Sequence, residues 1–296
     1  MIKQLSILIP VYNQICINKV MKLKELCDDA RDIGLEYEIL VADDGSQNEA
    51  INEANSAINQ MAHCKHIIKN KNEGSAATRN FLAEQSKYEW LLFIDCDVDI
   101  PDTEFITKYI YASQDNHVVN GGISIGRNIG KHNLRYLYEK HEAPAHTPEQ
   151  RNRHPYQSFR SANFMIKKSI FMTIKFNECM RRYEDVYLGK VLKQYNYKIL
   201  HIDNPVVMND FENNNEYMEK IEYDLRTLYE FRNELNGYSR ILELCKKIHQ
   251  ISPLCFLVRA WHCLAGKLER SLLTKVYPNT NILKLYRIGY LTSIYK

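Results

Sequence analysis

Several features that would define other classes of protein are missing from this sequence. None of its eight cysteines stands in a C-x-x-C pair, and their spacing suits neither a zinc site nor a small disulfide framework. We therefore expect reduced thiols in a cytosolic protein. The sequence has no N-glycosylation sequon and no apolar run of the roughly 18 residues that a membrane span requires. Residues 1–5 lead directly into a predicted strand, so we expect no cleavable signal peptide.

An excess of positive charge is missing from most of the chain. Residues 1–237 contain 29 Lys/Arg and 34 Asp/Glu, whereas residues 238–296 contain ten Lys/Arg and two Asp/Glu. An acidic body disfavours a nucleic-acid-binding protein, and the basic end indicates a segment that can meet an anionic surface. The pattern G-x-G-x-x-G is also absent after the first predicted strand, which disfavours a nicotinamide-dependent reductase.

Strands and helices alternate over the first hundred residues. Helical patterns cover residues 18–33 and 49–61, and a third helix opens at residues 72–75. Between them lie apolar segments typical of buried strands, at residues 6–13, 37–46, 66–68 and 90–94. This alternation predicts an α/β fold with a mostly parallel, doubly wound (Rossmann-like) sheet flanked by helices.

The apolar run at residues 90–94 leads into two acidic residues, Asp95 and Asp97. Residues two apart on an extended chain point to the same side, so both carboxylates are expected together at the end of the strand. Open α/β sheets bind ligands outside the carboxyl ends of their strands. A hard divalent cation would relieve the repulsion between the carboxylates and leave positions for phosphate oxygens. Taken alone, such a pair is more often a solvated acidic turn.

Four short motifs together resemble the nucleotide-binding half of a family 2 glycosyltransferase with the GT-A fold. They stand at residues 9–13, at residues 41–46, at residues 72–74 with Arg79 and Asn80, and at residues 95–97. The resemblance covers roughly residues 1–210. It implies a nucleotide-diphosphate sugar as donor, most often a UDP-sugar.

The resemblance also implies roles for individual residues. The nucleotide would be bound by positions from all four motifs: Pro10, Tyr12, Asn13, Asp43, Asp44, Gly74, Arg79 and Asp95. Asp95 would touch the ribose or the metal, and Asp97 would bind Mn²⁺ or Mg²⁺ that bridges the diphosphate. A glycine at the start of a helix lets the backbone approach phosphate, and an arginine can pair with diphosphate.

A second acidic signature follows a predicted strand at residues 161–166. Glu184 and Asp185 open an amphipathic helix, where acidic residues are often only partners of the helix dipole. The resemblance makes Asp185 the general base and Glu184 a supporting or acceptor-binding group. It implies inverting transfer of a hexosyl or N-acetylhexosaminyl group to a glycan or lipid-linked acceptor, in a bacterial surface-polysaccharide pathway.

The sequence departs from the family at Met208, where a histidine is expected as a further metal ligand. A thioether is a poor ligand for Mn²⁺ or Mg²⁺, so Asn209, Asp210 or His201 would have to substitute. His201 lies on an apolar strand, which favours a packed and hydrogen-bonded role. The departure keeps open a second interpretation, a catalytically weak or inactive nucleotide-sugar-binding scaffold.

The middle of the chain is expected to complete the site. Residues 118–125 are predicted as one strand, whose pair Gly121–Gly122 would keep space open near the donor sugar. Residues 127–160 are predicted as a mobile region over the acceptor, part helix and part loop. The spacing of the four histidines in this region (132, 141, 146 and 154) suits no single helix face, which disfavours a metal site there.

The predicted domains are a catalytic domain at 1–212 and a C-terminal helical extension at 213–296. The catalytic domain divides into a nucleotide-binding half, 1–100, and an acceptor-binding half, 101–212. In the extension, one helix is predicted at 216–235, and a further apolar stripe begins at Leu254. Basic, aromatic and amphipathic helices can lie in a membrane interface, here the inner face of the cell membrane. Packing against the body or a second subunit predicts the same stripe, so both interpretations stay open.

Overall fold

The computed structural model describes residues 2–126, 129–275 and 277–295. The chain forms two compact units, of which unit 1 is Met1–Gly126 with Ala145–Asn209 and unit 2 is Arg127–Pro144 with Asp210–Lys296. The predicted domain boundary at residue 212 lies close to the last crossing between these units. The segment 127–144 was predicted within the catalytic domain and is grouped with unit 2.

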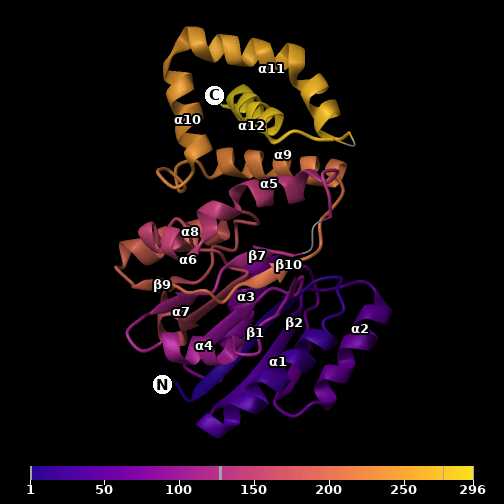
Figure 1. The fold of residues 1–296 in the computed structure, drawn as a ribbon, viewed down its shortest axis with the longest axis vertical. Coiled ribbons are helices and arrows are strands. Elements are labelled where there is room, and N and C mark those ends of the chain that lie inside the picture. The colour runs from indigo at the N-terminus through magenta and orange to yellow at the C-terminus, as the bar shows by residue number, and fades with distance from the viewer. Residues whose placement is uncertain (1, 127–128, 276, 296) are drawn as a thin grey trace. The chain divides into compact units, whose positions relative to one another are not determined.

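Unit 1 is built on a seven-stranded sheet (Figure 1) with the strand order β3-β2-β1-β4-β8-β6-β9. The strands are β1 (Gln4–Val11), β2 (Glu36–Asp43), β3 (Cys64–Ile68), β4 (Trp90–Ile94), β6 (Val118–Asn120), β8 (Asn163–Lys167) and β9 (Ile199–His201). The pairs β1–β2, β2–β3, β1–β4 and β6–β9 are parallel, and β8 is antiparallel to both β4 and β6. The mostly parallel sheet predicted from the sequence is confirmed.

Helices cover both faces of this sheet. The helices of unit 1 are α1 (Ile17–Asp29), α2 (Glu49–Ser56), α3 (Ser75–Gln85), α4 (Phe105–Ala112), α6 (Pro148–Arg153), α7 (Lys168–Ile174) and α8 (Glu184–Gln194). Ile7 and Ile9 of β1 pack on one face with side chains of α1 and α4. Leu8 and Phe93 pack on the other face with side chains of α3, α7 and α8. Because β1 and β4 are buried on both faces, β4 is a continuous apolar run, and β1 is apolar apart from Gln4 and Ser6.

A three-stranded sheet completes unit 1. Its order is β5-β10-β7, with β5 at Val98–Asp99, β10 at Val206–Met208 and β7 at Ile123–Ile125. Met208 stands opposite Val98 in this sheet. The segment 118–125, predicted as one strand, is therefore divided between two sheets.

The division falls at the glycine pair, which does not keep space open as predicted. A Cβ on Gly121 would lie 2.4 Å from the carbonyl oxygen of Asn204 and 2.5 Å from the hydroxyl of Tyr109. Gly122 has φ +88°, and its Cβ would lie 2.7 Å from the guanidinium of Arg151. Protein atoms fill the space beside both glycines, so the absence of a side chain serves close packing.

Unit 2 is helical in the part that the structure describes. Its helices are α5 (Leu134–Glu142), α9 (Asn214–Glu230), α10 (Arg240–Gln250), α11 (Ser252–Leu273) and α12 (Thr280–Ile294). Figure 1 shows α12 enclosed by α9, α10 and α11, which all contact it. The helix predicted at 216–235 is confirmed, although it ends at Glu230. Among the described helices, none combines the length and the apolar content needed to cross a membrane.

The region 127–160 contains more helix than loop where it is described. Residues 127 and 128 lie outside the described residues, and the remainder includes α5, a 3₁₀ turn at Ala143–His146 and α6. Within the described chain, no group of three or more metal-ligating side chains is found, and this includes the histidines of this region.

Two glycines with left-handed backbone form a matched pair for a stability test. Gly34 and Gly45 have φ +82° and +76°, but only at Gly45 would a Cβ meet backbone, 2.6 Å from the carbonyl carbon of Lys71. We expect Gly34→Ala to lower the free energy of unfolding by about 1–2 kcal/mol, the cost of a left-handed alanine. Gly45→Ala should cost about 3 kcal/mol or more, because the facing loop must also move. Urea unfolding measures both losses, and equal losses would contradict the close approach at Gly45.

Candidate functional site

The predicted nucleotide-binding residues gather at one edge of the sheet in unit 1. Because β1, β2 and β4 are parallel, their carboxyl ends lie on the same side. The set comprises Pro10, Tyr12 and Asn13 in and after β1, Asp43 and Asp44 at the end of β2, Asp95 after β4, and Gly74 and Arg79 in α3 and its N-cap. The structure thus brings together residues that are spread over 85 positions of the sequence from Pro10 to Asp95.

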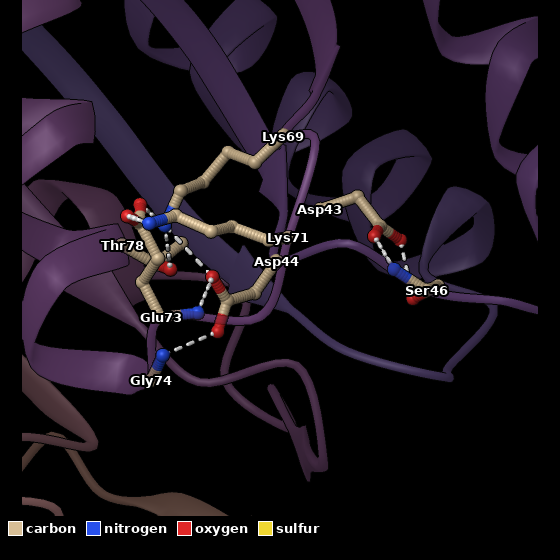
Figure 2. Close-up of polar contacts among 8 residues, drawn as sticks. All are labelled: Asp43, Asp44, Ser46, Lys69, Lys71, Glu73, Gly74 and Thr78. Atoms are coloured by element: carbon tan, nitrogen blue, oxygen red, sulfur yellow. Dashed lines mark hydrogen bonds and ion pairs between the residues drawn. The ribbon is translucent and has the colours of Figure 1, made fainter.

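Asp44 is buried, and its carboxylate holds the loop that precedes α3 (Figure 2). Lys69 Nζ donates to Asp44 Oδ1 at 2.7 Å. The backbone N–H groups of Glu73 and Gly74 donate to the same carboxylate at 3.0 Å and 2.7 Å. Lys69 also donates to Thr78 Oγ1 at 3.1 Å. Asp44 therefore fixes the start of α3 to the end of β2, and its role as a direct ligand of the base stays a prediction.

Asp43 holds the turn that follows β1. Its carboxylate accepts hydrogen bonds from the backbone N–H and the hydroxyl of Ser46 at 2.6 Å and 2.7 Å. The same hydroxyl accepts from the backbone N–H of Asn13 at 2.7 Å. Asn13 has φ +51°, a conformation that asparagine tolerates better than most residues. The turn leaves the ring of Tyr12 48% exposed, which makes its face available to a flat ring of a ligand.

Arg79 connects the two acidic signatures. It is 3% exposed, its Nη2 donates to Asp95 Oδ1 at 2.5 Å, and its Nη1 lies 3.5 Å from Glu184 Oε1. The guanidinium carbon also lies 5.4 Å from the centre of the Phe176 ring. Among the described residues, Nε and Nη1 of Arg79 have no hydrogen-bond acceptor. Buried donors are nearly always satisfied, so an oxygen of a bound ligand or an ordered water is expected at these two atoms.

The carboxyls beside Arg79 are harder to ionise than exposed carboxyls. Burial raises the pKa of Glu184 to about 7, Asp185 adds to the rise, and Arg79 opposes it. Ser75 Oγ donates to Glu184 Oε1 at 3.2 Å. Burial also raises the pKa of Asp95, again against the effect of Arg79. One guanidinium therefore compensates two partly buried carboxyls whose ionisation is opposed by their surroundings.

Asp97 offers a carboxylate that a cation can reach. It is exposed in the turn after β4 and has no side-chain hydrogen bond or ion pair within residues 2–126, 129–275 and 277–295. Mg²⁺ is usually held by one or two carboxylates together with substrate phosphates, without a closed protein cage. Asp97, with Asp95 before it, fits that kind of site, and diphosphate oxygens would complete it.

Two of the residues considered as substitutes for the missing histidine have other contacts. His201 is buried, its Nε2 lies 2.9 Å from the carbonyl oxygen of Pro155, and burial lowers its pKa to about 4. The packed and hydrogen-bonded role predicted for His201 is confirmed. Asn209 donates to the carboxylate of Asp99. Asp210 is exposed, and its role as a metal ligand, like the roles of Asp95 and Asp97, stays a prediction.

Two residues of the site were not identified from the sequence. Lys69 follows β3 directly, at the same edge of the sheet. A basic residue directly after this strand could have indicated from the sequence that Lys69 belongs to the site. Ser75 is the first residue of α3, and its partner Glu184 lies 109 residues further along the chain. No local pattern predicts a contact over that separation.

Comparison with known proteins places these motifs in a family. A family model described as glycosyl transferase family 2 matches residues 6–182. An uncharacterized glycosyltransferase of Haemophilus influenzae is 30% identical over 115 residues, which cover 39% of this chain and 44% of that protein. The chain thus aligns with less than half of the length of this relative.

Solved structures of low sequence identity share the fold. Residues 1–349 of TarS from S. aureus match with a TM-score of 0.53 and 15% identity, over 98% of this chain and 90% of that one. The mannosyltransferase PcManGT from Pyrobaculum calidifontis, in complex with GDP-Man and Mn²⁺, matches with a TM-score of 0.60 and 12% identity, over 98% and 85%. TarS 1–349 has also been solved with UDP and with UDP-GlcNAc. The likeness confirms the predicted GT-A fold.

The family match includes all four motifs of the nucleotide-binding half, and Glu184 follows it by two residues. The matched segment covers more than half of the chain. The chain belongs to the glycosyltransferases of family 2.

Proposed function

We propose that this chain is an inverting glycosyltransferase that moves a sugar from a nucleotide-diphosphate sugar, with UDP favoured, to a hydroxyl of a glycan or lipid-linked glycan. The observation that carries the proposal is the position of Arg79, 2.5 Å from Asp95 and 3.5 Å from Glu184. One buried cation thus joins the acidic motif after β4 to the acidic motif at the start of α8. A donor held by the first and an acceptor activated by the second would react within a single site.

The donor would lie along the carboxyl edge of the sheet. In the proposal, the turn with Pro10, Tyr12 and Asn13 binds the base. Asp43 holds this turn in place, and Asp44 holds the loop that precedes α3. Gly74 is the N-cap of α3 and makes no side-chain cap hydrogen bond, and the positive end of this helix favours an anionic diphosphate. Nε and Nη1 of Arg79, which have no hydrogen-bond acceptor among the described residues, would donate to an oxygen of the same ligand.

The proposed step is a single displacement. The acceptor oxygen forms a bond to the anomeric carbon while the bond from that carbon to the diphosphate breaks, and the diphosphate leaves with the electron pair. The acceptor oxygen attacks from the face opposite the leaving group, which inverts the anomeric configuration, and Asp185 takes the proton of the attacking hydroxyl. Glu184 has a pKa of about 7, so it is partly protonated at neutral pH and limits the negative charge beside Asp185.

A divalent cation fits the donor side of the proposal. Mn²⁺ or Mg²⁺ would neutralise the charge that gathers on the diphosphate as the glycosidic bond breaks. Asp97 would hold the cation, with Asp95 beside it. Asp95 also keeps its contact with Arg79, so its carboxylate would serve both the arginine and the ion.

The nature of the donor and acceptor is part of the same proposal. The complexes of TarS with UDP-GlcNAc and of PcManGT with GDP-Man support a hexosyl or N-acetylhexosaminyl group as the transferred sugar. We place the reaction in surface-polysaccharide biosynthesis. A lipid-linked acceptor would bring the enzyme to the cytoplasmic face of the cell membrane.

A nucleotide-sugar-binding scaffold without turnover is the second candidate. Met208 favours it, because this thioether stands beside Val98, the residue that follows Asp97. The paired acids at the start of α8 and their contact with Arg79 favour the enzyme, since a scaffold needs no general base.

Asp185→Asn tests the general base. We expect kcat to fall by about 10²–10⁴-fold, the usual contribution of a positioned base, while UDP affinity in calorimetry stays unchanged. Asp115→Asn, at an exposed position before β6, is the matched control and should turn over like the wild type. Unchanged turnover in Asp185→Asn would contradict the assignment. A wild-type chain that binds UDP but turns over no donor would favour the scaffold.

Glu184→Gln tests the raised pKa through stability. In the unfolded chain this carboxyl has its usual pKa of 4.5, and in the folded chain its pKa is about 7. Between these values the folded state holds the proton more tightly, so the free energy of unfolding of the wild type should fall as pH rises from 4.5 to 7. The glutamine variant lacks this titration, so its stability relative to wild type should increase over the same range. Urea unfolding at a series of pH values measures the difference, and a constant difference would show that Glu184 is not buried as described.

A further inference from the structure

One face of α11 is apolar and exposed. Five residues at spacings of three, four, three and four lie on one stripe of this helix: Leu254, Leu257, Trp261, Leu264 and Leu268. Their exposed fractions run from 40% for Leu254 to 85% for Leu264. Large apolar side chains are usually scattered singly on a protein surface, so a continuous stripe indicates an interaction site.

The opposite face of α11 is already used within unit 2. Cys255, Gly266 and Leu273 are buried, and α11 packs on α12. Close approach is needed there, because a Cβ on Gly266 or on Gly289 of α12 would lie less than 3 Å from the ring of His262. The packing of unit 2 therefore accounts for this inner face and leaves the stripe without a partner among the described residues.

The stripe carries no negative charge. Glu269 is the one acidic residue in the sequence of α11, and it is buried. Its Oε1 accepts from Trp261 Nε1 at 2.9 Å, which satisfies the polar atom of the tryptophan. The ring of Trp261 is nevertheless 55% exposed, so it presents carbon atoms to the outside. A tryptophan in this state suits the boundary between water and acyl chains.

Positive charge predominates in the C-terminal sequence that contains the stripe. Residues 238–296 contain ten Lys/Arg and two Asp/Glu, and one of those two acids is the buried Glu269. Exposed lysines stand on α10, α11 and α12, at Lys246, Lys247, Lys267 and Lys284. An apolar stripe with basic neighbours is complementary to anionic lipid headgroups above acyl chains.

We propose that this face of α11 docks the chain on an anionic membrane surface, with the helix lying in the interface and the five apolar side chains inserted. A second copy of the chain fits less well, because a symmetric contact would bring the same basic residues together. The surface belongs to unit 2 alone, so the proposal goes beyond sugar transfer and does not depend on it.

The test is co-sedimentation of the full chain with vesicles. We expect binding to vesicles of phosphatidylcholine mixed with phosphatidylglycerol, and much weaker binding to phosphatidylcholine alone. Leu257→Glu and Leu264→Glu should each lower the partition coefficient about tenfold or more, because they remove an inserted side chain and add a repelled charge. Lys267→Gln should lower it about fivefold, and higher salt should weaken the wild type.

Met21→Glu is the matched control, because Met21 is 53% exposed on α1 of unit 1 and the change adds the same charge. Circular dichroism shows that each variant is folded, and light scattering gives its oligomeric state. The proposal would be overturned if the wild-type chain did not bind the anionic vesicles, or if it bound both vesicle types equally. A dimer that Leu264→Glu converts to monomer, without vesicle binding in the wild type, would assign the stripe to a second copy. No nucleotide is present, so a failure here leaves the proposed sugar transfer untouched, and UDP binding tests that separately.

Discussion

The guanidinium of Arg79 is buried where α3 packs against the sheet. A buried positive charge destabilises the fold unless negative groups beside it compensate it. Asp95 and Glu184 supply that compensation from two segments that are 89 residues apart. Removing one member of such a buried set typically costs about 3–5 kcal/mol, because the remaining charge loses its partner. The same contacts bring the acidic motif after β4 and the acidic motif at the start of α8 to one place. Stability and the geometry of the site therefore depend on the same interaction.

A second set of charges plays a similar role at the neighbouring strand end. The carboxylate of Asp44 binds Lys69 and two backbone N–H groups, and Asp43 binds Ser46. Loops at a sheet edge bury little apolar surface, so polar contacts must fix their conformation. The two acids at the end of β2 in this way shape the turns around Tyr12 and Gly74. In the proposed function, Asp43 and Asp44 would act on the nucleotide through the backbone that they hold.

The sheet was predictable because its buried strands are continuous apolar runs separated by helical patterns. The antiparallel direction of β8 was not predictable, because the residue pattern of a short strand does not indicate its direction in a sheet. Only the pairing of β8 with β4 and β6 defines that direction. The split at Gly121–Gly122 was missed because the reason for the glycines is close contact with Asn204 and Arg151, residues far along the chain. Motif residues of the site were found from their strand ends, whereas the pairing of Arg79 with both acidic motifs and of Ser75 with Glu184 required the folded structure. His201 was correctly read as packed because it stands on an apolar strand.

Calorimetric titration of UDP in the presence and absence of Mn²⁺, with GDP and dTDP for comparison, tests the account most directly. It addresses the claim that the edge formed by Tyr12, Arg79, Asp95 and Asp97 binds a nucleotide diphosphate with a cation. We expect UDP to bind, more tightly with Mn²⁺, and the dependence on Mn²⁺ to be lost in Asp97→Asn while weak metal-free binding persists. Absence of nucleotide binding with and without the metal would contradict the assignment of this edge.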